Sequence, residues 1–598
     1  MKKGKHYWWY GTAAALCVAV ALIWIGNTTS EKEHMKQDSA TKQETTYEEI
    51  YQNFSKIWRE QAVGYSDIAL LSETGDAETA GDHDYGKTNQ QEENVEEADI
   101  IKNDGRYLYR IVQNESQYEI QIVDTQGGLT KKSSIGTFDN VSEFYVSGNQ
   151  LILMETGWAE NETKTGEYFS GRAFCRVHIY DITDRQKPSK IKTFTVAGNY
   201  LNSRISDGYL YFFTQDNVYK PGSKKDYDEY VPFINGKPMS ADKIYLPADN
   251  TTTSYLVMAS VNLEKPDQFA DTTAIVCSGE RFYASEKNIY IADMVYQEYT
   301  QEGEDTNKTK LYRVSYRKGK LKKEAEGTVK GILRDDMAWS EYDGYLRLVT
   351  TVDSYRTDKV TDDITGEELG YATSDRARTN SLYVLDKDLK VVGKLENLAK
   401  GEQIKSARFL GTSGYFVTFR QVDPLFSVDI SNPKEPELLD ELKVSGFSEY
   451  LHFYGENRLL GIGLEADSES GSTEGLKLSM FDISDAAKIK EETKLPLEKY
   501  DYAEALYNYK AVLINAEKNI FGFLAEGYGE KSSCEYLLFT YENGQFCEKL
   551  TIDCSDIPNN QNRARGTYIG DSFYLLCADG TIEEYSLQTA QKLAELEE

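Results

Sequence analysis

The chain has few of the residues that most often carry out catalysis or bind metals. Its 598 residues include five histidines and seven cysteines, and no two cysteines are separated by two residues. A zinc site or a thioredoxin-type centre with Cys-x-x-Cys spacing therefore has no support. With only 11 prolines and 44 glycines, the composition also fits neither a collagen-like chain nor disorder throughout.

Basic residues are outnumbered by acidic ones. The chain carries 67 Lys and Arg against 98 Asp and Glu, which gives a formal charge of -31. Such a surface repels phosphate backbones and anionic lipid on average, so we expect no nucleic-acid partner.

Tyrosine is abundant, with 44 residues beside 23 Phe and 6 Trp. Aromatic residues favour β-strands and contact surfaces, so a mostly β protein is expected. The chain is too long for one small core, which predicts several domains or one large repetitive architecture.

The N-terminal sequence is typical of a membrane anchor. Residues 1–7 contain three lysines, and an uncharged stretch runs from Trp8 to Ile25. At about 1.5 Å per residue this stretch just spans a hydrocarbon core of about 30 Å, so residues 8–26 are predicted to be a transmembrane helix. The lysines predict that residues 1–7 are cytoplasmic and the rest extracellular. A cleaved signal peptide is less favoured because no A-x-A-like site closes the stretch, and a lipoprotein attached through Cys17 is weaker still.

A stalk, a helix and a second linker are expected next. Residues 27–43 are polar and charged, which predicts a flexible stalk. Within residues 44–61 apolar side chains recur at helical spacing, and Thr46 and Glu49 are placed as a capping box, so a short amphipathic helix that packs on another part of the protein is expected. Residues 62–93 have acidic linker composition, without the spacing of a calcium-binding EF-hand.

From residue 94 to the C-terminus the chain repeats a unit of short strands. The second and third strands are the clearest, as in the pairs YLYRI with YEIQIVD and YLYFFT with YLVMASV, and nine such pairs can be counted. Turn sequences favoured between antiparallel strands accompany them, including Asp207-Gly208, Asp343-Gly344 and Asn543-Gly544.

About nine four-stranded antiparallel sheets in sequence must each bury two faces, and radial packing achieves this without long exposed edges. We therefore predict an all-β fold, a β-propeller of eight or nine four-stranded antiparallel blades over residues 94–598. Propellers typically have four to eight blades, so nine would make an unusually wide ring.

Three segments carry a family resemblance: Thr88 to Tyr109, Val177 to Thr214 and Phe419 to Gly463. They resemble the bacterial and archaeal family of secreted proteins with a C-terminal β-propeller distantly related to WD repeats. The opening around Val95 departs from the family pattern, which more often has Gly before this Val and Asp after it. The resemblance implies the fold and export, and it implies no reaction, because the family has no agreed activity.

No catalytic or cofactor-binding motif is present. The nucleophile-elbow, zincin, P-loop and dinucleotide-binding patterns do not occur in the required context. Within the propeller, His178 and His452 are each expected to be packing or hydrogen-bonding residues. We therefore predict no catalytic residue, no cofactor and no metal site, while a pair of catalytic carboxylates among the 98 acidic residues stays open.

Four of the six cysteines outside the predicted anchor lie near the C-terminus. If Glu542 pairs with Gln545 across the hairpin turn, Cys534 faces Asp553, and a bridge to Cys554 needs a β-bulge. A Cys534–Cys554 disulfide and six small buried thiols are both open.

Long insertions fall between the second and third strands of five units. In an antiparallel blade all such loops leave by the same face of the disc. The longest, residues 215–253, mixes charge with aromatic side chains and is our candidate centre of a binding surface, with five candidate binding residues: Tyr219, Tyr227, Tyr230, Phe233 and Tyr245. The alternative is a self-packed flap that covers the propeller face.

Together these features predict a single-pass, membrane-anchored extracellular β-propeller that acts as a binding or scaffold module at the bacterial cell surface. The expected partner is a protein or a cell-envelope glycan. The competing interpretation is an exported hydrolase or lyase with acidic residues in the propeller channel. A deep channel-mouth pocket with convergent titratable groups would favour the enzyme, and a broad aromatic and acidic surface would favour the binding module.

Overall fold

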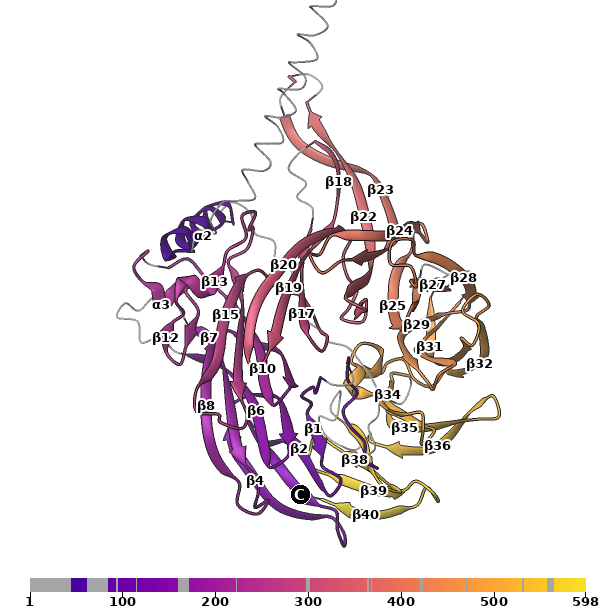
Figure 1. Ribbon diagram of the computed structural model, residues 1–598. Coiled ribbons are helices and arrows are strands. Elements are labelled where there is room, and N and C mark those ends of the chain that lie inside the picture. The colour runs from indigo at the N-terminus through magenta and orange to yellow at the C-terminus, as the bar shows by residue number, and fades with distance from the viewer. Residues whose placement is uncertain are drawn as a thin grey trace, which may run out of the picture.

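The repeating units of the sequence fold into nine antiparallel sheets. The structure is a computed structural model, and it describes residues 45–61 and 84–597 apart from 93–94, 115, 160–170, 222, 297–301, 363–364, 367, 420–422, 468–471, 530–531 and 556–563. Each sheet contains four main strands in chain order and forms one blade of a β-propeller. Figure 1 shows the blades in a ring that brings the C-terminal blade beside the N-terminal one. The predicted all-β propeller is confirmed, with nine blades.

The main strands have the following bounds. The first three blades are β1 (Ile101–Asn103), β2 (Tyr107–Asn114), β3 (Gln117–Asp124) and β4 (Thr130–Phe138); β5 (Val141–Ser147), β6 (Gln150–Ala159), β7 (Arg172–Asp181) and β8 (Ser189–Ala197); and β9 (Asn199–Ser206), β10 (Tyr209–Asn217), β14 (Ser254–Asn262) and β15 (Phe269–Val276). The next three are β16 (Arg281–Ala284), β17 (Asn288–Val295), β19 (Lys308–Arg317) and β20 (Lys320–Lys330); β21 (Trp339–Tyr342), β22 (Tyr345–Thr361), β23 (Glu368–Leu385) and β24 (Val391–Leu398); and β25 (Gln403–Leu410), β26 (Ser413–Phe419), β27 (Asp423–Asp429) and β28 (Glu437–Val444). The last three are β29 (Phe447–Phe453), β30 (Arg458–Ala466), β31 (Thr473–Asp482) and β32 (Lys490–Leu497); β33 (Leu513–Asn515), β34 (Ile520–Gly527), β35 (Ser533–Glu542) and β36 (Gln545–Asp553); and β37 (Arg565–Ile569), β38 (Ser572–Leu576), β39 (Ile582–Ser586) and β40 (Lys592–Leu596).

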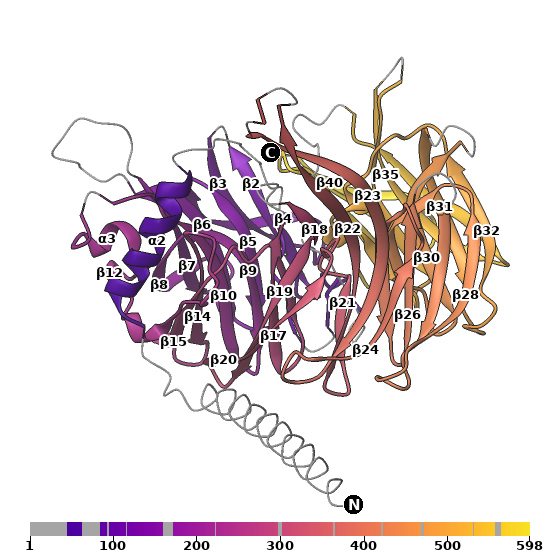
Figure 2. The same ribbon diagram turned by 90° about the horizontal axis from the view of Figure 1, so that it is seen from above.

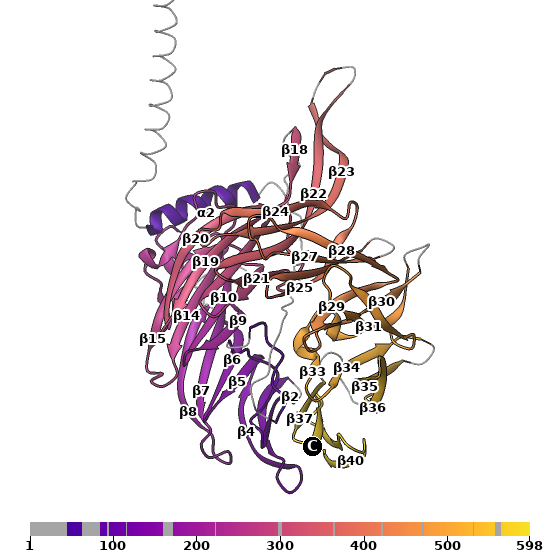
Figure 3. The same cartoon turned by 45° about the vertical axis from the view of Figure 1, so that its right-hand side comes forward.

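Shorter helices and strands accompany the main strands of the blades. They are the helices α2 (Tyr47–Gln61) and α3 (Tyr227–Tyr230), the 3₁₀ turns η1 (Ala241–Lys243), η2 (Glu504–Leu506) and η3 (Tyr509–Ala511), and the strands β11 (Phe233–Ile234), β12 (Lys237–Pro238), β13 (Ile244–Tyr245) and β18 (Gly303–Thr306). In the fifth blade β22 and β23 extend well beyond the disc, and β18 pairs with β22 there (Figure 3).

Two-residue turns with left-handed backbone connect several of the strands. Asp207 and Gly208 have φ angles of 50° and 73°, and Asn543 and Gly544 have 53° and 77°. Positive φ at both central residues is the requirement of a type I′ turn, which glycine adopts without strain and Asp and Asn tolerate. The hairpin turns predicted at these positions are confirmed.

The hydrophobic core consists of clusters that lie between neighbouring blades all around the ring. The cluster that closes the ring contains Leu108 and Val123 of the first blade and Tyr574 and Ile582 of the ninth. The first blade contains only N-terminal strands of the propeller and the ninth only C-terminal ones, so these two sheets share no strand. Contact between apolar side chains joins them instead. Radial packing thus buries both faces of each sheet.

The amphipathic helix α2 lies at the rim of the ring beside α3 (Figures 1 and 2). Its capping box is present, since Thr46 N–H donates to Glu49 Oε2 (2.8 Å) and Glu49 N–H donates to Thr46 Oγ1 (3.2 Å). Ile50 and Phe54 are fully buried in the cluster shared by the second and third blades. Burying each of these side chains contributes about 1.5–3 kcal/mol to the free energy of unfolding. The helix expected within residues 44–61 is confirmed, and it packs on the propeller.

Residues 84–92 and 95–100, together called the strap, run along the inner edges of the blades. Three isolated β-bridges attach it to the innermost strands of blades nine, three and two: Tyr85 with Ile569, Glu96 with Ile205 and Asp99 with Phe144. The sequence assigned residues 84–92 to the acidic linker, and this boundary is corrected, because the structure places them inside the ring. The physical reason is pairing with residues far away in the chain: Gly86 N–H donates to Tyr568 O (2.8 Å), and the Tyr283 hydroxyl donates to Glu92 Oε1.

The predicted membrane segment is not among the described residues. The expected cytoplasmic residues 1–7, the transmembrane helix at 8–26, the stalk at 27–43 and residues 62–83 of the linker all lie outside them. Among the helices that the structure does describe, none is long and apolar enough to cross a bilayer.

The hairpin of β35 and β36 has the predicted register at its turn, and a β-bulge in its middle shifts the pairing by one residue. This shift places Cys534 opposite Cys554, and Cys554 N–H donates to Cys534 O (2.8 Å). Both are free thiols in the structure. Four of the six described cysteines are buried, whereas Cys534 is half-buried and Cys547 is exposed.

Candidate functional site

A cavity of about 650 Å³ lies at one mouth of the central channel. Its rim includes Tyr342, Gly411, Gly455 and Ala516, which stand at the turns between the first and second strands of blades five to eight. Residues 85–92 of the strap also line it. We call it the turn-face cavity. Its volume is within the range of small-molecule sites, and the long insertions leave the blades on the opposite face.

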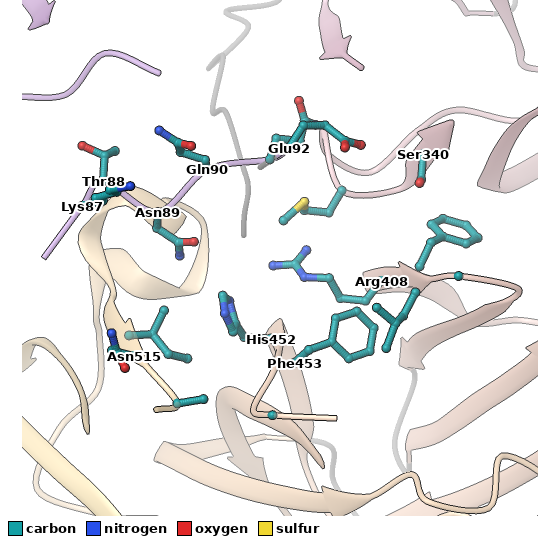
Figure 4. A pocket seen from close by; sticks show the side chains of 18 of the residues that line it. Lys87, Thr88, Asn89, Gln90, Glu92, Ser340, Arg408, His452, Phe453 and Asn515 are labelled. Carbon is teal, nitrogen blue, oxygen red and sulfur yellow. The ribbon is translucent and has the colours of Figure 1, made fainter. Parts of the chain in front are cut away.

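The walls combine aromatic and hydrogen-bonding side chains. The aromatic ones are Tyr85, Tyr283, Trp339, Tyr342, Phe409, Phe453 and Tyr568. The polar ones include Lys87, Asn89, Gln90, Glu92, Ser340, Arg408, His452 and Asn515, several of which Figure 4 shows around the cavity. Aromatic faces can pack on the apolar faces of a ligand while a few placed polar groups fix its orientation.

Arg347 of β22 is fixed in the wall between two aromatic rings. Its guanidinium carbon lies 5.1 Å from the ring centroids of both Tyr342 and Phe409. Nη2 donates to Ser340 Oγ (2.9 Å) and Nη1 donates to Gly411 O. Burial lowers the pKa of Arg347 to about 10, so the side chain is still a cation at neutral pH.

Arg408 of β25 and His452 of β29 point towards the centre of the cavity (Figure 4). The Arg408 guanidinium lies 5.2 Å from the ring centroid of Tyr450, and the Tyr450 hydroxyl lies 2.7 Å from His452 Nδ1. The same hydroxyl accepts a hydrogen bond from Asn89 Nδ2 of the strap (3.0 Å). This network joins the strap to the inner strand of the seventh blade.

Glu92 is a carboxylic acid of the strap that lines this cavity. The Tyr283 hydroxyl donates a hydrogen bond to Glu92 Oε1. Burial raises the pKa of Glu92 to about 7; the Tyr283 hydrogen bond opposes this shift and the nearby Glu341 carboxylate adds to it. A carboxyl group that titrates near neutral pH in a cavity is a candidate acid or base.

Three buried polar atoms of cavity residues have no hydrogen-bond partner among the described residues: Asn89 Oδ1, Trp339 Nε1 and Arg347 Nε. These side chains belong to residues that are 8%, 2% and 3% exposed. Buried polar groups in folded proteins are nearly always hydrogen-bonded. One acceptor and two donors in the cavity wall therefore have unused hydrogen-bonding capacity among the described residues.

Residues 85–590 match the Beta propeller domain family. The chain belongs to this family. An uncharacterised protein of Methanocaldococcus jannaschii is 26% identical over 550 residues, which cover 80% of each chain. One of Archaeoglobus fulgidus is 36% identical over 278 residues, or 46% of this chain and 37% of that protein. Among solved structures, apo AztD of Citrobacter koseri is 11% identical over 74% of this chain and 94% of that chain, with a TM-score of 0.32.

In this member of the Beta propeller domain family, the five candidate binding residues lie away from the turn-face cavity, in the loop between β10 and β14. Tyr230 is fully buried, and its carbonyl accepts a hydrogen bond from the Tyr255 hydroxyl (2.9 Å). Phe233 and Tyr245 belong to β11 and β13, which extend the outer edges of blades two and three. Tyr219 is the most exposed at 76%.

The last of the five, Tyr227, is 40% exposed and packs against Tyr47 of α2, with ring centroids 4.7 Å apart. The loop thus folds largely onto the outer rim and helps to hold α2, rather than covering the propeller face. The role of these five residues in binding stays a prediction.

Of the two propeller histidines, His178 is structural, since its ring nitrogens lie 2.9 Å from Glu155 Oε2 and 3.0 Å from Thr193 Oγ1. His452 lines the cavity, which its strand sequence did not indicate. The innermost strand of each unit carried a signal that could have located the channel. In a chain this acidic, basic residues in these short strands mark the channel wall. They include Lys102, Arg204, Arg281, Arg408 and Arg565. Within the described part of the chain, no group of three or more Cys, His, Asp or Glu side chains could hold a metal ion.

Proposed function

We propose that this protein is a membrane-anchored, extracellular binding module of the bacterial cell surface, and that its turn-face cavity binds a cell-envelope glycan. The coarser part of this proposal, a propeller with a binding or scaffold role, follows from the fold and the family. The anchor and its orientation rest on the sequence of residues 1–26.

The observation that carries the binding site is the set of three unpartnered buried atoms around one aromatic-walled cavity. A sugar ring has apolar C–H faces and a rim of hydroxyl groups, each of which both donates and accepts. Hydroxyls can therefore satisfy Asn89 Oδ1, Trp339 Nε1 and Arg347 Nε together, while rings such as Phe409 and Phe453 cover the apolar face of the sugar. A concave site of this size suits a short saccharide better than the flat surface of a folded protein.

The test is binding of soluble oligosaccharides, released from the envelope of the producing cell, to the full-length protein in detergent. Trp339→Phe keeps an aromatic ring and removes the N–H group. We therefore expect the affinity for the oligosaccharide to fall by about threefold to tenfold, which corresponds to the net free energy of one hydrogen bond. Trp58→Phe is the matched control, because Trp58 Nε1 is also buried without a partner among the described residues but lies on α2. Equal affinity of Trp339→Phe and wild type would contradict the assignment of the site.

Orientation is tested separately by adding protease to intact cells. Removal of the propeller with retention of a short N-terminal fragment is the expected result. Survival of the propeller on cells whose other surface proteins are digested would show that the domain lies inside.

Glu92 favours a second candidate, the exported hydrolase or lyase. Its pKa of about 7 suits a general acid, and Glu341, whose charge helps to raise it, lines the same cavity. The two candidates differ in one measurement, which is product formation from the oligosaccharide that binds. An enzyme would release shorter products and lose this activity in Glu92→Gln, whereas a binding module would return the oligosaccharide unchanged.

A further inference from the structure

Three of the six described cysteines gather in one hydrophobic cluster, which lies between the eighth and ninth blades. Cys554 and Cys577 are buried members of this cluster, and Cys534 packs against it. The other two buried cysteines, Cys175 and Cys277, belong to two different clusters. The thiols are therefore concentrated at a single interface between blades, and we call Cys534, Cys554 and Cys577 the thiol cluster.

Cys554 and Cys577 come from different blades, and their thiols are in contact. Cys554 directly follows β36, the outer strand of the eighth blade, and Cys577 directly follows β38, the second strand of the ninth. The two thiols are hydrogen-bonded to each other, and this contact raises the pKa of Cys577. Both backbones are fixed, since Cys554 N–H donates to Cys534 O (2.8 Å) and Cys577 N–H donates to Thr581 O (2.9 Å). Two sulfur atoms in contact on fixed backbones meet the first requirement for a disulfide bond.

Cys534 is a less well placed partner for Cys554. The backbone hydrogen bond between them puts the two residues directly opposite each other, at a hydrogen-bonded position of the antiparallel pairing of β35 with β36. The Cβ atoms of such a pair are about 5.5 Å apart, whereas a disulfide bond needs about 3.5–4.5 Å. The geometry of the sheet therefore favours Cys577.

We infer that Cys554 and Cys577 form a disulfide bond that joins the eighth blade to the ninth. One S–S bond forms and one breaks: the two thiols give up two electrons and two protons to an external disulfide such as glutathione disulfide, which becomes two thiols. The exchange takes place during folding, because thiolate is the attacking species and the raised pKa of Cys577 leaves little thiolate once the blades have closed. The proposed extracellular location supplies the oxidising medium, and the bond does not depend on the proposed glycan site.

The test is peptide mapping of the full-length protein, purified in detergent from cells lysed in N-ethylmaleimide and digested without reduction. Trypsin cleaves after Lys549 and Arg563, so the three residues of the thiol cluster fall on three different peptides. We expect one linked pair of peptides that contains Cys554 and Cys577, and a third peptide in which Cys534 is alkylated. A bond between Cys534 and Cys554 would overturn the inference.

A second sample separates the chemistry of the pair from the location of the protein. The full-length protein is unfolded in urea with reductant, refolded in a glutathione redox buffer and then mapped in the same way. Formation of the Cys554–Cys577 bond in this sample supports the inference even if the protein taken from cells is reduced, and that second result would instead contradict the proposed extracellular location. Absence of the bond from both samples would overturn the inference.

Thermal melting with and without reductant gives an independent measurement. Cys554 and Cys577 are 23 positions apart, so the bond restrains a loop of the unfolded chain, and reduction should lower the melting temperature by about 3 °C. Cys577→Ser should lose this response to reductant, whereas Cys534→Ser should keep it. Cys547→Ser, which alters an exposed thiol of the β35–β36 hairpin, is the control and should respond like wild type. Each variant is compared with itself, so a loss of stability from the substitution cancels. An equal response in Cys577→Ser and wild type would overturn the inference.

Discussion

The hydroxyl of Tyr283, on the inner strand of the fourth blade, donates a hydrogen bond to the carboxyl group of Glu92 in the strap. This contact joins residues 191 positions apart in the chain. It fixes the strap against β16 and holds a carboxyl group at the wall of the turn-face cavity. The contact should therefore make both the cavity and the stability of the ring sensitive to pH.

Glu92→Gln should change how stability depends on pH. The folded-state pKa of Glu92 is raised to about 7 from an ordinary value near 4.5, so between these values the folded protein holds a proton that the unfolded chain releases. The free energy of unfolding then falls as pH rises through this window, by up to about 3 kcal/mol for this group. The variant has no such group, so its stability relative to wild type should increase from pH 5 to pH 8.

The measurement is urea unfolding of both proteins at several pH values, and only the difference between them is informative. Burial raises the pKa of Glu280 to about 8 and that of Asp336 to about 7, so these groups titrate in the same range in both proteins. Glu437→Gln, on the outer strand β28, is the charge-matched control. A difference between Glu92→Gln and wild type that does not vary with pH would contradict the prediction.

The buried pair of Arg204 and Glu97 provides a test of the strap. Arg204→Met leaves the Glu97 carboxylate buried with only uncharged donors such as the Tyr509 hydroxyl, and should lower the free energy of unfolding by about 3–5 kcal/mol. Adding Glu97→Gln removes the unpaired charge, so the double variant should recover much of this loss. Thermal melting of the three proteins checks both expectations, and equal melting of the single and double variants would show that the charges are not coupled.

The sequence predicted the propeller because the fold depends on local patterns. Strand alternation and turns such as Asn543-Gly544 are visible within a few residues, so nine repeat units could be counted and a propeller of eight or nine blades predicted. The strap could not be foreseen in the same way. Residues 84–92 have no strand periodicity, and their place depends on partners such as Tyr283 and Tyr568, which follow them by hundreds of residues.

The turn-face cavity could not be predicted for a related reason. Its walls come largely from the inner strands, which are as short as the three residues of β33, whereas the repeat is recognisable from its longer second and third strands. One residue from each of several blades, such as Arg408 and His452, forms a site only when the ring closes. The insertions, in contrast, are conspicuous because they are long and aromatic, although length and composition do not distinguish a binding loop from a flap.

Docking of α2 should contribute measurably to stability. Phe54→Ala removes a fully buried ring from the cluster shared with blades two and three and should cost about 3–5 kcal/mol if the helix and the propeller unfold together. Lys56→Ala, on the exposed side of the same helix, is the control and should change stability by less than about 0.5 kcal/mol. Differential scanning calorimetry distinguishes the outcomes, and an unchanged transition in Phe54→Ala would mean that α2 is released before the propeller unfolds.

Deleting residues 220–248 should destabilise the protein, because much of this loop is core. Tyr230, Met239 and Ile244 are at most 3% exposed and belong to the same cluster as Phe54. The loop also holds α2 directly, since the Tyr47 hydroxyl donates to Met239 O (2.8 Å). We therefore expect a lower melting temperature and faster amide hydrogen exchange in residues 47–61. Tyr219→Ala, which alters only an exposed side chain of the same loop, should show neither effect. A deletion variant that melts and exchanges like wild type would show that the loop is a dispensable surface feature, and a binding role for it would then regain support.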